Sequence, residues 1–162
     1  MRRSALIFLG LFLVTVAAGV AIYADSRSDG GASADLLQYA DASTVAAGEN
    51  IYRVHCASCH GAELEGEPNW QRPNPDSTMP APPHNERGHT WHHTDQVLFD
   101  LTKYGVEKFV KLENYKSNMP AYENVLTDEE IIAVLSFIKS TWPDDIQAGH
   151  NALNARKRTS GQ

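Results

Sequence analysis

The two cysteines of the chain stand three positions apart and are followed at once by a histidine, in the stretch CASCH that contains Cys56, Cys59 and His60. A C-x-x-C-H sequence is typical of covalent haem c attachment, in which both thiols form thioethers with the porphyrin and the histidine binds the iron. A disulfide or a dithiol redox motif is the alternative for two cysteines in an exported protein. Neither alternative needs the adjacent histidine, so the motif predicts one covalently bound haem c.

A haem iron that only moves electrons normally has a second axial ligand, and a methionine thioether in that place raises the potential by favouring Fe(II). Met1 is excluded by its position, and the other two methionines both precede a proline, Met79 in TMPAP and Met119 in NMPAY. Met119 lies far enough beyond His60 for the chain to wrap the haem, and it just precedes a strongly predicted helix. We therefore predict Met119 as the second ligand, with Met79 as the alternative.

Two predicted helices flank this attachment region. The first begins near Ser43 or Thr44 with Thr44 as its cap, and Gly48 would allow a close crossing with another helix. The second follows Thr94, a natural N-cap, and ends at Gly105. These short helices alone supply a thin apolar core, which a bound cofactor would complete.

The clearest predicted helix is LTDEEIIAVLSFIKSTWP, where Thr127 and Glu130 form a capping box and Pro143 ends the pattern. Residues 61–90 are rich in Pro, Gly and Asn and predict a long loop, which a compact domain tolerates when something fills its centre. No segment has convincing strand alternation. The predicted fold class is therefore all-α, with three or four short helices wrapped around one covalently bound haem.

The N-terminal segment predicts a transmembrane helix. Residues 4–24 carry no charge and follow Arg2 and Arg3, and such a run is long enough to cross a bilayer as a helix. A cleaved signal sequence is the alternative, although its apolar core is usually shorter. In either case the positive-inside rule places the rest of the chain on the far side of the membrane.

The chain divides into four predicted parts: a membrane anchor or signal sequence over 1–24, a linker over 25–42, the haem domain over 43–145 and a polar tail over 146–162, which is expected to fray from residue 151 onward. Without Arg2 and Arg3, 12 Lys and Arg oppose 20 Asp and Glu, a formal charge of −8. This acidic balance argues against nucleic acid as a partner.

Four of the seven histidines lie in the stretch HNERGHTWHH: His84, His89, His92 and His93. Imidazole is a common metal ligand, so a copper site beside the haem is one interpretation of this loop. The histidines precede a predicted helix rather than lie along it, so their spacing cannot show whether they converge. A loop whose histidines only face water is a second interpretation.

A loop at the haem edge is the third interpretation, because haem propionates are costly to bury without hydrogen-bond donors. Arg87 and the Trp91 indole are suitable donors. One of His89, His92 or His93 would add a third. A titrating histidine coupled to the iron would make the midpoint potential depend on pH.

The stretches GENIYRVHCASCHG, NMPAY and LTDEEIIAVLSFIKS resemble the class I mono-haem cytochromes c in their membrane-anchored bacterial form, over residues 43–142. The resemblance implies the cytochrome c fold, with the first and last helices crossing near Gly48, and His60 and Met119 as axial ligands. In that family a proline carbonyl accepts the ring N–H of the proximal histidine, and Pro82 or Pro83 is placed for this role. The segment 65–93 is longer than the family pattern.

The implied function is that of a one-electron carrier and not of an enzyme. Its N-terminal helix would span the bacterial inner membrane once, with the haem domain in the periplasm. It would pass electrons between respiratory complexes, or between a membrane complex and a periplasmic redox enzyme such as an oxidase or reductase. Two axial ligands leave no position open for a substrate, whereas haem enzymes and gas sensors keep one open. A haem enzyme, a gas sensor and a haem protein with a copper-binding histidine loop remain the alternatives.

Overall fold

The computed structural model describes residues 35–110 and 115–160. Within these two ranges it contains helices and no strand, which confirms the all-α prediction for that part of the chain. None of the helices in this described part has the length and apolar character that a membrane crossing requires. The predicted transmembrane helix over 1–24 lies outside the described residues.

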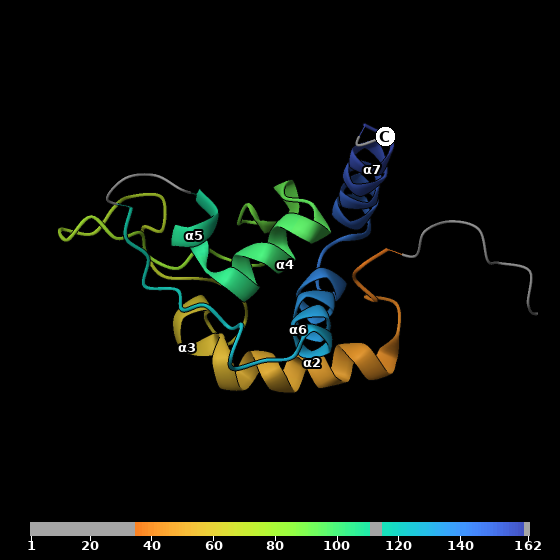
Figure 1. The fold of residues 1–162 in the computed structure, drawn as a ribbon, viewed down its shortest axis with the longest axis horizontal. Helices are drawn as coiled ribbons and strands as arrows, with labels where there is room; N and C mark the ends of the chain where they lie inside the picture. Colours follow the sequence, from red (N-terminus) through yellow and green to blue (C-terminus); the bar gives the residue numbers. More distant parts are fainter. Residues whose placement is uncertain (1–34, 111–114, 161–162) are drawn as a thin grey trace, which may run out of the picture. The chain divides into compact units, whose positions relative to one another are not determined.

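The described helices are interrupted by one long irregular segment, which lies between His60 and Thr90 (Figure 1). They are α2 Ala42–His55, α3 Ala57–His60, the 3-10 turn η1 Thr90–His92, α4 Asp95–Tyr104, α5 Val106–Val110, α6 Asp128–Ser140 and α7 Asp144–Ser160. Between α3 and η1 the chain forms only turns and bends, as predicted for the Pro- and Gly-rich loop. The crossing of α2 and α6 is the framework on which this loop is held.

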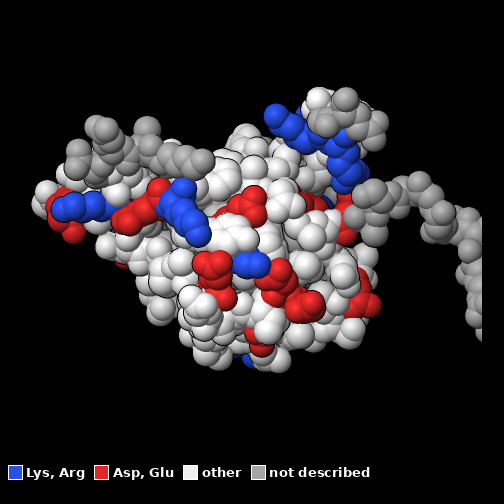
Figure 2. All heavy atoms as spheres, in the orientation of Figure 1, with Lys and Arg blue, Asp and Glu red and all other residues white. Residues whose placement is uncertain are grey.

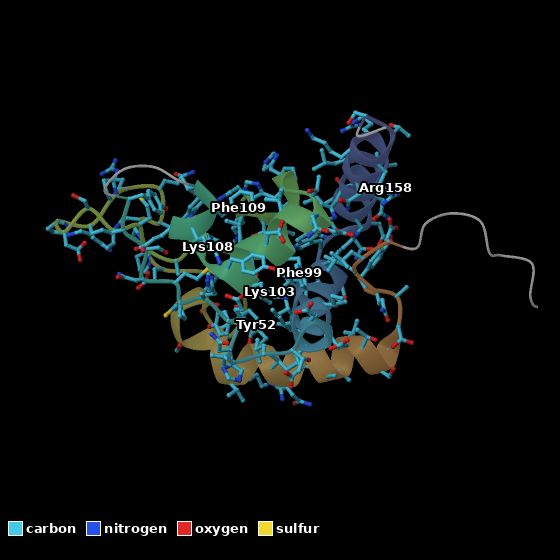
Figure 3. All side chains as sticks on the ribbon, viewed as in Figure 1. Tyr52, Phe99, Lys103, Lys108, Phe109 and Arg158 are labelled. Carbon is cyan, nitrogen blue, oxygen red and sulfur yellow. The ribbon has the colours of Figure 1, made fainter. Side chains whose placement is uncertain are left out.

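The α2–α6 crossing depends on Gly48, which is buried on α2. A Cβ atom at this position would lie only 2.0 Å from the Ala133 carbonyl oxygen of α6, so the two backbones are in direct contact. One turn later α2 carries the buried Tyr52 (Figure 3). The centre of its ring lies 5.5 Å from the centre of the Phe137 ring of α6. The apolar face of α6 consists of Ile131, Val134, Leu135 and Ile138. The predicted close crossing at Gly48 is therefore confirmed.

Among the helices of the described ranges, three have N-termini that are capped by side chains. Thr94 accepts a hydrogen bond from the Val97 N–H, and Thr127 forms the capping box of α6, both as predicted. The prediction of Thr44 as the cap of α2 is wrong. The Asp41 carboxylate caps this helix by accepting from the Thr44 N–H at 2.7 Å, and its hydrogen bonds, the one from Ser43 first, lower the pKa of Asp41 to about 2.

The C-terminal segment forms the helix α7, so the prediction of a frayed end over 151–162 is wrong for the part that the structure describes. The segment has little apolar surface, which is why its pattern did not predict a helix. Two polar side chains attach it instead: His150 is 1% exposed and Asn154 is 5% exposed. Figure 2 shows basic side chains gathered near the end of this helix, where Arg156, Lys157 and Arg158 are exposed.

A buried polar cluster connects α7 to α4 and α6. Asn154 accepts from the Asp95 N–H at 2.9 Å and donates to Asp95 Oδ1 at 2.9 Å. Lys139 of α6 is completely buried, with its Nζ 3.8 Å from Asp95 Oδ1 and 4.4 Å from the centre of the Tyr39 ring. Buried charges of this kind are tolerated when they are paired, and removal of one partner is strongly destabilising. The cluster thus replaces the apolar contacts that α7 lacks.

His150 makes the stability of this cluster depend on pH. Its Nε2–H donates to the His93 carbonyl oxygen at 2.8 Å, and its Nδ1 lies 3.6 Å from Asp95 Oδ1. Burial first, and then the Lys139 charge, lower the pKa of His150 below 6.5, against the opposing effects of the His93 hydrogen bond, Asp95 and Asp35. His150 is therefore protonated more readily in the unfolded chain than in the folded protein. As a result, the free energy of unfolding should fall as the pH drops below about 6.5.

Denaturant unfolding of the wild type and of a His150→Gln variant over a series of pH values checks this prediction. Both proteins share the contributions of all other histidines, so the difference between their slopes isolates His150. We expect the variant to lose less stability between about pH 7 and about pH 5 than the wild type does. Parallel slopes would contradict the assignment.

Candidate haem site

The C-x-x-C-H motif occupies the end of α2 and the single turn of α3. Cys56 is half-buried and Cys59 is exposed, while His60 is 8% exposed. Burial, followed by the nearby Cys59, raises the pKa of the Cys56 thiol to about 11. A dithiol redox centre needs a lowered thiol pKa, so this environment does not suit that alternative.

Two tyrosines hold the backbone on either side of the motif. The hydroxyl of Tyr122 donates to the His55 carbonyl oxygen at 2.7 Å, just before the first cysteine. The hydroxyl of Tyr52 donates to the Gly61 carbonyl oxygen at 2.8 Å, just after the histidine. Both rings are buried in the core, so the motif is fixed relative to α2 and to the segment that precedes α6.

The His60 ring is oriented by a proline carbonyl. Its Nδ1 lies 2.9 Å from the Pro82 oxygen, which can only accept, so Nδ1 carries the proton and Nε2 keeps a free lone pair in the neutral ring. The sequence offered Pro82 or Pro83 for this contact, and the structure has Pro82. Cβ atoms at Gly66 and Gly88 would lie 2.5 Å and 1.9 Å from Pro83 backbone atoms, so only glycine lets these segments approach the proline pair.

His84 was grouped with the other histidines of its loop in the sequence, but the structure separates it from them. Its ring stacks on the His60 ring, with centroids 4.0 Å apart and planes inclined by 21°. Burial, and then the neighbouring His60, hold the pKa of His84 well below its usual range. No pattern in the sequence indicates this contact, because it joins the motif to an irregular segment more than 20 residues further along the chain.

Two of the remaining histidines of the loop, His89 and His92, pack on tryptophans. The His89 ring stacks on Trp70 at 5.3 Å and meets the edge of His93 at 5.5 Å, and the His92 ring stacks on Trp91 at 3.7 Å. Across residues 35–110 and 115–160, no three His, Cys, Asp or Glu side chains come together in a way that could hold a metal ion. A copper site in this loop would therefore have to be built on two imidazoles, those of His89 and His93.

The two other predicted propionate donors differ in their surroundings. Trp91 Nε1 is buried and has no hydrogen-bond partner among the described residues. A buried indole N–H without an acceptor is rare, and a haem propionate is an acceptor of the right charge. The Arg87 side chain is 81% exposed, and its Nε lies 3.9 Å from the Glu86 carboxylate. The orphaned indole, together with two thiols and a histidine with a free Nε2, fits haem c.

The two methionines also differ. Met119 packs against the apolar core, and its N–H donates to Ser117 Oγ at 3.1 Å. Met79 is 38% exposed. The more buried thioether is therefore the one predicted as the ligand.

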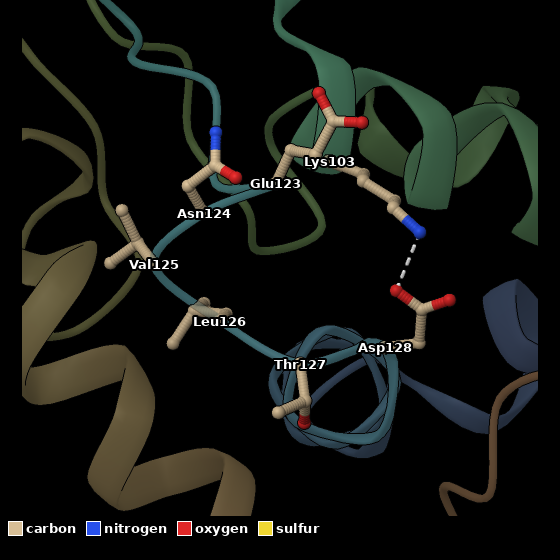
Figure 4. A pocket seen from close by; sticks show the side chains of 7 residues that line it. All are labelled: Lys103, Glu123, Asn124, Val125, Leu126, Thr127 and Asp128. Carbon is tan, nitrogen blue, oxygen red and sulfur yellow. Dashed lines mark hydrogen bonds and ion pairs between the residues drawn. The ribbon is translucent and has the colours of Figure 1, made fainter.

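One surface hollow lies between the end of α4 and the start of α6, and another lies between α5 and the segment around Met119. The larger, of about 430 Å³, is crossed by the ion pair between Lys103 Nζ and Asp128 Oδ1 at 2.7 Å (Figure 4), and it is lined by none of the predicted haem-site residues. The smaller, of about 350 Å³, includes Met119 in its lining. The larger hollow is therefore separate from the attachment motif.

Comparison with known proteins agrees with this site. The family model described as cytochrome c matches residues 45–142, which is more than half of the chain. The chain is 26% identical over 109 residues to the Cbb3-type cytochrome c oxidase subunit FixP of Sinorhizobium medicae. This match covers 67% of the chain but only 32% of that relative. No solved structure is significantly similar. The chain belongs to the cytochrome c family.

Proposed function

We propose that this protein is a one-electron carrier with a single haem c, attached through Cys56 and Cys59 and ligated by His60 and Met119. The observation that carries the proposal is the His60 ring, whose Nδ1–H is tied to the Pro82 carbonyl so that Nε2 is the free donor. A haem bound in this way supplies reversible exchange of one electron at the iron. The membership of the cytochrome c family supports electron transfer.

The residues around the motif suit a carrier better than an enzyme. The backbone of the motif is held by Tyr52 and Tyr122, and the His60 ring is held by Pro82. With Met119 as the sixth ligand, this rigid frame would leave no position open for a substrate. We assign Trp91 as a propionate donor because its buried N–H needs an acceptor. Arg87, which is exposed, would reach a propionate only from the solvent side.

We further propose that residues 1–24 anchor the chain in the bacterial inner membrane with the haem domain in the periplasm. The uncharged run after Arg2 and Arg3 supports an anchor. The chain spans about a third of the length of its relative, which is named as an oxidase subunit. Membrane redox complexes and periplasmic redox enzymes are the corresponding partners here, and tethering would raise the local concentration at them.

Spectroscopy of membrane and soluble fractions, followed by a redox titration of the purified protein, tests the proposal. We expect a c-type haem in the membrane fraction that titrates as a single one-electron couple. A haem that is extracted by acidic organic solvent would contradict covalent attachment. Two resolved couples would contradict a single haem, and recovery only in the soluble fraction would contradict the anchor.

A further inference from the structure

The contact between His84 and His60 is the most specific feature of the site that the proposed function leaves unexplained. The two rings lie nearly parallel, with centroids 4.0 Å apart, and His60 is buried while His84 is partly buried. The hydrogen bond from His60 Nδ1 to the Pro82 oxygen fixes one edge of the His60 ring. It still allows the ring to rock about the line of that bond. A flat ring in contact with the His60 face blocks this second motion.

His84 is itself held from three directions. Its N–H donates to the Leu64 carbonyl oxygen at 2.9 Å, and its carbonyl oxygen accepts from Trp142 Nε1 at 2.8 Å. Its ring Nδ1 lies 2.8 Å from the hydroxyl of the buried Thr90. These partners lie in the loop after the motif, just past the end of α6 and in η1. The position of the His84 ring is therefore set by the core and not by the local loop alone.

We propose that His84 is a positioning residue, whose ring fixes the plane of the His60 imidazole and contributes to the midpoint potential through its π face. The inference rests on the proposed role of His60 as an axial ligand. Oxidation of an iron adds positive charge that spreads in part onto the ligand imidazole. The face of a neutral aromatic ring is negative and attracts such charge. A stacked ring therefore stabilises the oxidised state relative to an aliphatic side chain in the same place.

Variants of the full-length holoprotein test the inference through the midpoint potential and the ferric low-spin EPR spectrum, whose g values report the orientation of the axial imidazole plane. We expect His84→Leu to raise the potential and to broaden or shift the g values. His84→Phe keeps a flat aromatic face and should stay closer to the wild type in both measurements. Thr90→Val keeps the imidazole but removes its anchor, and should change the g values in the same direction as His84→Leu and to a smaller extent.

His55→Leu is the matched control, because this histidine also lies beside the attachment motif but its ring meets the edge of Tyr122, at 6.1 Å, instead of stacking on His60. It should alter neither measurement. A His84→Leu protein with a full haem content and with wild-type potential and g values would overturn the inference. So would an equal shift in the His55 control. If His84→Leu does not fold, His84→Phe and Thr90→Val test the inference in its place. It would then be overturned by wild-type g values in Thr90→Val together with a shifted potential in His84→Phe.

Different results would contradict the proposed ligation of the haem and the proposed role of His84. If the wild-type protein has no low-spin ferric signal, the ligation proposed for His60 and Met119 is wrong and the role of His84 falls with it. If the wild-type signal is present and only the His84 variants are unchanged, the proposed function stands and the positioning role alone is wrong.

Discussion

Replacement of Met119 by alanine should convert the haem from a closed, low-spin site to one that binds carbon monoxide in its ferrous form. Alanine has no donor atom, and the segment around it is held by other contacts, so no other residue is drawn in. The Ser117 N–H donates to the Glu107 carboxylate at 2.8 Å, and the Tyr122 N–H donates to the Thr102 carbonyl oxygen at 3.1 Å. Loss of the thioether should also lower the midpoint potential, because this ligand favours Fe(II).

The same substitution should cost about 2 kcal/mol of stability, near the lower end for a methionine-to-alanine change, because Met119 is only partly buried. Met79→Ala is the matched control and should leave the spectrum, the potential and carbon monoxide binding unchanged. Absorption spectra of both ferric and ferrous variants check the prediction. The reverse pattern, with an altered Met79 variant and an unaltered Met119 variant, would show that the ligand assignment is wrong.

Replacement of Gly48 by alanine should separate α2 from α6 and strongly destabilise the protein. The added Cβ would meet the Ala133 carbonyl oxygen at 2.0 Å and the Ala133 carbonyl carbon at 2.5 Å, and these are backbone atoms that cannot move aside alone. Overpacking of a tight contact costs roughly 1–3 kcal/mol and sometimes more. Because α2 also carries Tyr52, which holds the end of the attachment motif, we expect a lower yield of holoprotein as well.

Gly149→Ala provides the control for this experiment. Gly149 also lies in a helix, but a Cβ there has no neighbour within 4 Å. Alanine is the better helix former, so this variant should be more stable than the wild type by about 0.5–1 kcal/mol. Thermal or denaturant unfolding of the two variants measures the contrast. Equal effects of the two substitutions would mean that the α2–α6 contact at Gly48 is looser than the structure has it.

Local patterns predicted those features whose physical cause is local. Thr94 and Thr127 cap their helices because a hydroxyl accepts from an N–H three residues ahead, and both residues of that interaction are visible in the sequence. The attachment motif is likewise contained in five residues. The helix α7 was missed because it is attached through His150 and Asn154, and their partners His93 and Asp95 are more than 50 positions away.

The histidine loop shows the same limit at the site itself. On an irregular backbone, the spacing of these four histidines in the sequence cannot show which of their rings contacts the His60 ring. Only the folded chain separates His84, which stacks on His60, from His89 and His92, which stack on tryptophans. The sequence also could not predict whether Pro82 or Pro83 contacts His60. This choice depends on how closely the backbone at Gly66 and Gly88 approaches the two prolines.

Exposure of the dithionite-reduced wild-type protein to carbon monoxide tests whether the iron is fully ligated, since an electron carrier with His60 and Met119 as axial ligands has no free position on its iron. We predict a c-type absorption spectrum that is the same with and without the gas at neutral pH. Rapid formation of a carbon monoxide adduct would contradict the account and place the protein among haem enzymes or gas sensors.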